Sequence, residues 1–230
     1  MEIIRSWISF IFLFTVKILS MIFYRFKIGW PDKEHRIKWD KVRLIIFLNH
    51  TSLYEFLYVG FLPVSFLKRL SRRMVAPGAD KTMNRPIVGF FFKLFNPGII
   101  SITRKKDWTW HNFLSRIHDD SIILIVPEGR MKRRNGLDLE GKKMTVRAGV
   151  TDIIAGLDKG QMVFAYSGGL HHVQVPDEGW PKLFKTLKMN LETMDIADYK
   201  TSFHAKAGTE AWKKLILDDL QNRLENKIPV

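Results

Sequence analysis

Three short apolar segments of this sequence lead directly into polar or charged side chains. The segments comprise residues 44–48, 99–103 and 122–126. Residues 44–48 and 122–126 are continuous apolar runs, which are typical of strands that are buried on both faces. Residues 99–103, Ile-Ile-Ser-Ile-Thr, are also predicted to form a strand. The polar residues that follow them include His50, Arg104 and Glu128. Because ligands in open α/β sheets bind beyond the strand ends, these three residues are candidates for a functional site.

Helical patterns separate these strands along the chain. Further strands are predicted at residues 74–76, 162–166 and 188–196, the last as an edge strand. Helices are predicted from residue 52 and at residues 86–95, 108–117, 146–157 and 209–226. Strands that alternate with helices imply an α/β fold with a largely parallel sheet flanked by helices.

Composition and charge limit the classes of partner. The chain has 230 residues, 46% of them hydrophobic, which is enough for the core of one domain plus an appendage. It contains no cysteine, which excludes disulfides, thiolate metal sites and a cysteine nucleophile. The net charge of +14 indicates either a polyanionic partner or a solvated basic face. No nucleic-acid motif organises the basic residues, so we predict anionic membrane lipids, and not nucleic acid, as the partner.

The N-terminal segment, residues 7–24, is almost entirely apolar. As a helix it would be about 27 Å long, slightly shorter than the hydrocarbon core of a bilayer. Lys17 lies near its middle, where a spanning helix would lose roughly 3 kcal/mol. A helix in the membrane plane lets that lysine reach the headgroups instead. We therefore predict a membrane-anchoring helix within residues 1–27, half-inserted rather than spanning, and an α/β domain at residues 28–230.

Two interpretations fit the residues that follow the first strand. Asn49 and His50 lead into a predicted helix with Ser52 at its N-cap and Glu55 at its third position. In a capping box, Glu55 reaches back to the N-cap amide. In a His–acid pair, the carboxylate fixes the imidazole tautomer and the other ring nitrogen of His50 acts as a general base. Spacing alone favours the capping box.

Four sequence blocks occur in order along the chain. They are Asn49-His50-x4-Glu55, Gly98-x4-Thr103-Arg104, Val126-Pro127-Glu128-Gly129 and Arg147-Ala148-Gly149. No single block is decisive, but the order and the intervals together resemble the glycerolipid acyltransferase family, the 1-acylglycerol-3-phosphate acyltransferases. The resemblance extends over roughly residues 25–200.

The resemblance implies a reaction and its catalytic residues. His50 would deprotonate a lipid hydroxyl, which attacks the thioester carbonyl of an acyl donor, and Glu55 would orient His50. The acyl chain would pass from acyl-CoA or acyl carrier protein to a lysophospholipid such as 1-acylglycerol-3-phosphate, in phospholipid biosynthesis or remodelling. The donor is a co-substrate, so no cofactor and no metal are expected, and acyl carrier protein is a further expected partner. We interpret His171 and His172 as loop histidines, because adjacent positions rarely ligate one ion together.

The resemblance also implies substrate-binding residues and a location. Arg104 would bind the acceptor phosphate, since a guanidinium fork matches phosphate geometry. Asn49, Glu128, Gly129 and Arg130 would also contact the substrate. The expected location is the membrane, at the cytoplasmic face of the inner or cell membrane.

Three positions depart from the family pattern. Glu55 stands where the glycerophosphate enzymes usually have Asp, although the late acyltransferases of lipid A tolerate Glu there. Arg130-Met131 follows the Glu-Gly pair where Thr-Arg is usual, and Phe164-Ala165-Tyr166 stands where Val-Pro-Val is common. These departures leave open an alternative function: a catalytically impaired family member that acts as a basic lipid- or membrane-binding protein.

Overall fold

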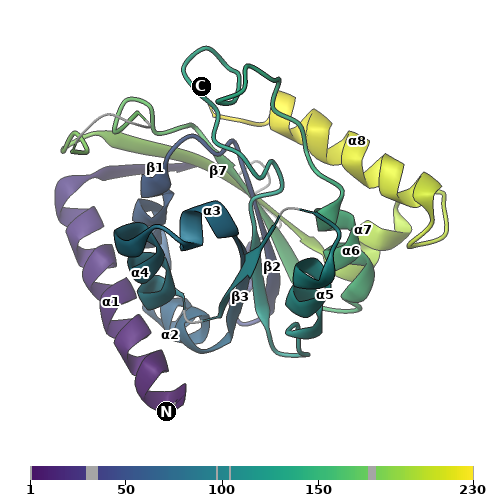
Figure 1. The fold of residues 1–230 in the computed structure, drawn as a ribbon, viewed down its shortest axis with the longest axis horizontal. Helices are drawn as coiled ribbons and strands as arrows, with labels where there is room; N and C mark the ends of the chain where they lie inside the picture. The colour runs from purple at the N-terminus through teal and green to yellow at the C-terminus, as the bar shows by residue number, and fades with distance from the viewer. Residues whose placement is uncertain (1, 30–35, 97, 104, 176–179, 230) are drawn as a thin grey trace. The chain divides into compact units, whose positions relative to one another are not determined.

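The computed structural model describes residues 2–29, 36–96, 98–103, 105–175 and 180–229 (Figure 1). The chain folds into two compact units. Unit 1 comprises residues 1–22 and 57–125, and unit 2 comprises residues 23–56 and 126–230. The predicted boundary after residue 27, between an anchor and a domain, stays a prediction.

Unit 2 is built on four strands in the order β1-β7-β6-β2. The strands are β1 (Arg25–Gly29), β2 (Val42–Leu48), β6 (Gln161–Ser167) and β7 (Thr186–Asp195). β1 and β7 are parallel, as are β2 and β6, whereas β6 and β7 are antiparallel. The helices are α6 (Gly149–Gly156), α7 (Ile196–Thr201) and α8 (Glu210–Asn226).

Unit 1 contains three strands and most of the helices. Its elements are α1 (Glu2–Phe23), α2 (Val64–Arg73), β3 (Met74–Ala79), α3 (Asp80–Met83), α4 (Pro86–Phe95), β4 (Ile99–Ile102), α5 (Trp108–Ser115) and β5 (Ile122–Ile125). β3 lies between β4 and β5 and is parallel to both. The last residue of α1 already belongs to unit 2. Together, the strand pairs of the two units confirm the predicted α/β class with largely parallel pairing.

Burial explains the strand patterns. In β2 nearly every residue is buried, as it is in β6, so residues 44–48 and 162–166 form apolar runs within these strands. In β7, buried and half-buried residues alternate, because only one face of the strand packs on the core. An edge strand was predicted at residues 188–196, and this prediction is wrong. β7 lies between β6 and β1. The sequence of β1 contains two basic residues and no buried position, so its pattern did not predict a strand outside β7.

The helix predicted from Ser52 is a 3₁₀ helix, η1 (Leu53–Phe61). Ser52 occupies the N-cap position as predicted, because its Oγ accepts the amide of Tyr54 at 3.2 Å. Residues 53–56 of η1 belong to unit 2 and the rest to unit 1. The site described below depends only on the unit 2 part.

Helix α1 is longer than predicted, and its side chains Ser9, Lys17 and Ser20 point into the protein and not toward lipid headgroups. It has 22 residues, so it is about 33 Å long and, by length and composition, able to cross a membrane. Its polar stripe faces the interior of unit 1: Ser9 and Ser20 are buried, and Lys17 Nζ donates to the carbonyl oxygen of Gly60 at 2.6 Å. The expectation that Lys17 reaches toward lipid headgroups is therefore wrong, since a backbone carbonyl binds it.

Candidate active site

The site begins at the turn that follows β2. Asn49 has a φ of 68°, in the left-handed region that asparagine tolerates better than most residues. Its buried side chain donates from Nδ2 to the carbonyl oxygen of Ser167, at the end of β6, at 2.7 Å. Because β2 and β6 are paired neighbours, this bond links the ends of the two strands. It thereby fixes the position of the backbone immediately before His50. A substrate contact of Asn49 stays a prediction.

His50 and Glu55 contact each other through His50 Nδ1 and Glu55 Oε2. The other oxygen of Glu55, Oε1, accepts the amides of Thr51 at 2.6 Å and Ser52 at 3.3 Å. One carboxylate therefore caps the start of η1 and also touches the imidazole, so the contacts expected from both interpretations are present. The role of His50 as a general base stays a prediction. A carboxylate on Nδ1 favours the tautomer in which Nε2 carries the lone pair, so Nε2 is the nitrogen able to take a proton.

The loop that follows β6 forms hydrogen bonds with the two residues after His50. The amide of Leu170 donates to Thr51 Oγ1 at 2.8 Å, and Ser52 Oγ donates to Gln174 Oε1 at 2.9 Å. Thr51 and Ser52 are both buried. Sequence reasoning missed Leu170 and Gln174, since no local pattern links positions about 120 residues apart.

Glu128 is almost fully buried and binds the backbone of the histidine loop. Its Oε1 accepts the amide of Asn49 at 2.6 Å, and its Oε2 accepts the amide of His50 at 3.1 Å. Burial raises the pKa of Glu128 to about 7, against the lowering effect of these amides. Glu128 therefore joins the loop after residue 125 to the loop that carries His50.

Gly129 occupies a position that favours glycine. Its φ is +63°, and a Cβ there would lie 3.2 Å from Cδ of Arg147. Arg147 donates from Nε to the carbonyl oxygen of Glu128 at 3.1 Å, and its own amide donates to Pro127 at 2.9 Å. The basic residue of the fourth sequence block thus holds the backbone of the third. The predicted substrate contacts of Glu128 and Gly129 remain predictions.

Arg130 already has carboxylate partners. Its Nη1 pairs with the buried Oδ2 of Asp138 and lies 3.8 Å from Oε2 of Glu140. Asp138 Oδ1 also accepts the amides of Glu140 at 2.9 Å and Lys142 at 2.8 Å, which closes the loop at residues 136–143. The position that usually carries threonine in the family therefore shapes a loop in this chain, and the predicted substrate contact of Arg130 is untested.

Lys132 lies beside the histidine loop, although no role was predicted for it. Its amide donates to the carbonyl oxygen of His50 at 2.7 Å, and its Nζ donates to Asn49 Oδ1 at 3.3 Å. Nε2 of His171 lies 2.8 Å from the carbonyl oxygen of Lys132. Four of the five residues at positions 130–134 are basic, and this charge is the signal that could have pointed to Lys132. This lysine places a cation next to the histidine loop.

Arg104, the predicted phosphate ligand, lies outside the described residues. Among the described residues, no three His, Cys, Asp or Glu side chains are grouped so as to hold a metal ion. The contact between His50 Nδ1 and Glu55 Oε2 is an arrangement able to perform acid–base chemistry.

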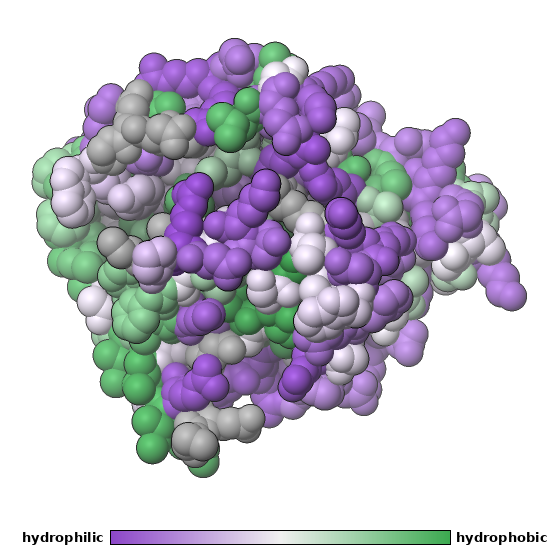
Figure 2. Space-filling view, viewed as in Figure 1, coloured by the Kyte–Doolittle hydropathy of each residue, from purple (hydrophilic) through white to green (hydrophobic). Residues whose placement is uncertain are grey.

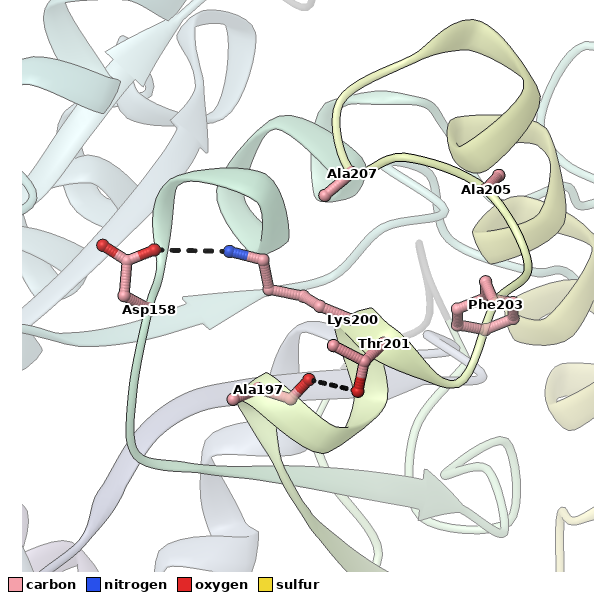
Figure 3. A pocket seen from close by; sticks show the side chains of 7 residues that line it. All are labelled: Asp158, Ala197, Lys200, Thr201, Phe203, Ala205 and Ala207. Atoms are coloured by element: carbon pink, nitrogen blue, oxygen red, sulfur yellow. Dashed lines mark hydrogen bonds and ion pairs between the residues drawn. The ribbon is translucent and has the colours of Figure 1, made fainter.

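A cavity of about 340 Å³ lies elsewhere in unit 2 (Figure 3). Its lining comes from α7 and neighbouring loops and comprises Asp158, Ala197, Lys200, Thr201, Phe203, Ala205 and Ala207. Nζ of Lys200 donates to the carbonyl oxygens of Ala155 at 3.0 Å and Leu157 at 2.9 Å, so its charge stabilises the end of α6. None of the predicted site residues lines this cavity.

The fold and the site define a class of protein. A profile of the family described as acyltransferase matches residues 31–159, more than half of the chain. The chain therefore belongs to the acyltransferase family, which confirms the resemblance seen in its motifs. The matched range includes every predicted site residue from Asn49 to Arg130.

One solved structure with the same fold is the 1-acyl-sn-glycerophosphate (LPA) acyltransferase PlsC from Thermotoga maritima. The likeness has a TM-score of 0.53 and covers 95% of this chain and 81% of that one. The two sequences are 12% identical, so the likeness concerns the fold alone. A comparison with curated protein sequences finds no match for this chain.

Proposed function

We propose that this protein is a membrane-anchored acyltransferase that moves a fatty acyl chain from acyl-CoA or acyl carrier protein to the hydroxyl of a lysophospholipid. A 1-acylglycerol-3-phosphate is the preferred acceptor, and the reaction serves phospholipid biosynthesis or remodelling. The observation that carries the proposal is the contact between His50 Nδ1 and Glu55 Oε2 in a member of the acyltransferase family.

The chemistry follows from the two ring nitrogens of His50. Glu55 holds Nδ1, so Nε2 accepts the proton of the acceptor hydroxyl while the hydroxyl oxygen bonds to the thioester carbonyl carbon. The tetrahedral oxyanion then collapses and expels the thiolate of the donor. This thiolate takes from Nε2 the proton that came from the acceptor hydroxyl. Glu55 stabilises the imidazolium that exists between these two proton transfers. The donor supplies the acyl group, and this route uses no metal and no cofactor.

The acceptor phosphate needs cations near His50. The family motif gives this role to Arg104, whose fork suits phosphate. In this chain Lys132 adds a second candidate, because its backbone is bonded to His50 and its Nζ lies 3.3 Å from Oδ1 of Asn49. A cation in that place suits an acceptor whose phosphate lies close to its reactive hydroxyl.

Membrane anchoring rests on α1, which we place in the plane of the membrane. The helix is attached to other elements of unit 1 along its length, so it cannot cross a bilayer without taking those elements with it. The contacts run from Trp7 with Lys68, through Phe12 with Phe91, to Lys17 with Gly60. An in-plane helix keeps these contacts while its apolar face enters the membrane. Location at the cytoplasmic face belongs to the same proposal, because acyl-CoA and acyl carrier protein are the donors.

The test is a panel of acyl donors and lysophospholipid acceptors, assayed on wild type, His50→Ala and His172→Ala. His172 is an exposed loop histidine and serves as the matched control. We expect turnover by wild type, a loss of roughly 10²- to 10⁴-fold in His50→Ala, and normal turnover in His172→Ala. A folded and active His50→Ala variant contradicts the mechanism. Wild-type protein that binds anionic vesicles but acylates no acceptor supports the impaired, lipid-binding alternative.

A further inference from the structure

The outer face of α1 is apolar over most of its length. Between residues 7 and 22 the exposed side chains are Trp7, Ile8, Ile11, Phe14, Thr15, Ile18, Leu19, Met21 and Ile22. The one hydroxyl among them, on Thr15, donates to the carbonyl oxygen of Ile11 at 2.9 Å. Hydrophobic residues gather along the side of unit 1 where α1 runs (Figure 2). A contiguous exposed apolar face that runs along most of a helix marks a binding surface.

Helix α4 extends this face. Phe90 and Phe91 are 63% and 50% exposed, and the ring of Phe91 lies 6.3 Å from that of Phe12 on α1. The backbone holds the two phenylalanines outward: a Cβ at Gly89 would lie 2.1 Å from the carbonyl oxygen of Met83, so α4 packs directly on the end of α3. Exposed aromatic rings on a tightly seated helix lose little conformational entropy when they enter an apolar phase.

Helix α2 gives the surface a basic margin. Lys68 Nζ and the guanidinium of Arg72 lie 5.8 and 5.9 Å from the ring of Trp7. Both cations are exposed, whereas Phe66 and Leu67 on the same helix are buried in unit 1. A tryptophan flanked by cations, at the end of an apolar face, matches the boundary between acyl chains and phosphate groups.

We propose that α4 is a second membrane-inserting element, and that Phe90 and Phe91 enter the same leaflet of an anionic bilayer as the outer face of α1. Lys68 and Arg72 then lie at the level of the lipid phosphates. The charge decides the occupant: an apolar face with a cationic margin complements anionic lipid, whereas a second copy of this chain, with its net charge of +14, would bring like charges together. This inference extends the membrane anchoring within the proposed function.

The absence of cysteine allows single labels to be placed on the full chain. An environment-sensitive fluorophore would be attached to Phe90→Cys, to Ile11→Cys on the outer face of α1, and to Leu215→Cys on α8. Ile11 is 60% exposed and reports on α1 itself, and Leu215 is 40% exposed on the charged helix of unit 2. Each labelled protein would be mixed with vesicles of anionic phospholipid that carry quenchers at known depths.

We expect position 90 to be quenched by acyl-chain quenchers as strongly as position 11, and position 215 to remain in water. Insertion at position 11 without insertion at position 90 overturns the proposal while α1 remains the anchor. No insertion at either position overturns both this inference and the membrane anchoring. A label at position 90 that is shielded without vesicles, in a protein that sedimentation shows to be dimeric, means that a second copy covers the face, which also overturns it.

Vesicle binding by variants gives an independent measurement. Phe90→Ser with Phe91→Ser should weaken partitioning into vesicles by on the order of tenfold for each ring. Leu215→Ser should leave partitioning unchanged. Binding by the double serine variant at wild-type strength contradicts the proposal, and circular dichroism of both variants checks that the fold is intact.

Discussion

Glu128 holds His50 through the backbone: Oε2 of the buried carboxylate accepts the amide of His50 at 3.1 Å. Its other oxygen accepts the amide of Asn49 at 2.6 Å. The geometry gives Glu128 a positioning role, and the substrate contact that the resemblance to known acyltransferases implies for it stays a prediction. The imidazole of His50 is thus fixed twice, by Glu55 on the ring and by Glu128 on the main chain.

The first prediction concerns the stability of this loop as a function of pH. Burial raises the pKa of Glu128 from its ordinary value of 4.5 to about 7, so the folded protein binds more protons than the unfolded chain between these values. The contribution of Glu128 to the free energy of unfolding is therefore fully present below pH 4.5 and falls as pH rises to about 7. The expected slope is at most about 1.4 kcal/mol per pH unit.

The variant Glu128→Gln isolates this contribution, because glutamine does not titrate. Urea unfolding of both proteins at several pH values should show the advantage of wild type over Glu128→Gln shrinking as pH rises from about 5 to 7. Other titrating groups cancel in the difference. A constant difference across this range would mean that Glu128 is already ionised in the folded protein.

The second prediction separates the two roles of Glu55. In Glu55→Gln the side-chain oxygen can still accept the amides of Thr51 and Ser52, so the cap survives. The amide nitrogen would then face Nδ1 of His50 and donate to it, which moves the ring proton to Nε2 and removes the base. We expect near-normal thermal stability with roughly a 10²-fold loss of turnover. A melting temperature that falls in step with activity would assign Glu55 to the cap alone.

Local pattern predicted much of the fold. The helix at residues 86–95 has the predicted bounds, because Pro86 marks its first turn and Asn96 follows its last residue. The buried strands at residues 44–48 and 122–126 were predicted within two residues of their observed ends, since a strand covered on both faces leaves a continuous apolar run. The contact of His50 with Glu55 was one of two readings, and both proved compatible.

Long-range contacts account for what the sequence did not reveal. Glu128 and His50 are separated by 78 positions, so no spacing rule predicts that one binds the amide of the other. The direction of Lys17 depended on whether a carbonyl of unit 1 lay within reach, and Gly60 provides one. The alternation along β7 shows that one face is buried but not which strands pair at its two edges.

The third prediction concerns the acceptor phosphate. Arg104→Ala and Lys132→Ala should each raise KM for a phosphate-bearing acceptor several-fold while leaving KM for the acyl donor nearly unchanged. Arg104→Lys should rescue poorly, because lysine lacks the guanidinium fork. Lys142→Ala is the matched control, since Lys142 pairs with Glu140 on an exposed surface. Equal effects on both substrates would reduce the two residues to general surface charge.

The fourth prediction explains the departure at residues 164–166 as structural. Arg223 of α8 donates to Tyr166 at 3.1 Å, pairs with Glu192 at 2.9 Å, and lies 4.4 Å from the ring centre of Phe164. Arg223→Met should destabilise the protein by roughly 1.5–3 kcal/mol, because the half-buried carboxylates of Glu192 and Asp219 each lose a charged hydrogen-bond donor. Denaturant unfolding measures this loss.

The control for this cluster lies on the same helix. Lys213 pairs with Glu210 near the surface, so Lys213→Met should change stability little. If Arg223→Met instead leaves stability unchanged but abolishes acyl transfer, the cluster is part of the reaction and the structural explanation is wrong.

The last prediction separates the two attractions to the membrane by salt. Charges on Lys68 and Arg72 act through a Debye length that shrinks to about 3 Å at about 1 M salt, whereas burial of the apolar face of α1 is largely indifferent to salt. The full-length protein should therefore remain on vesicles in high salt and leave only with detergent. Lys68→Gln with Arg72→Gln should slow binding to anionic vesicles at low salt and leave binding to neutral vesicles unchanged. Release of the wild-type protein by salt alone, measured by vesicle flotation, would mean that charge holds it there and that α1 does not enter the bilayer.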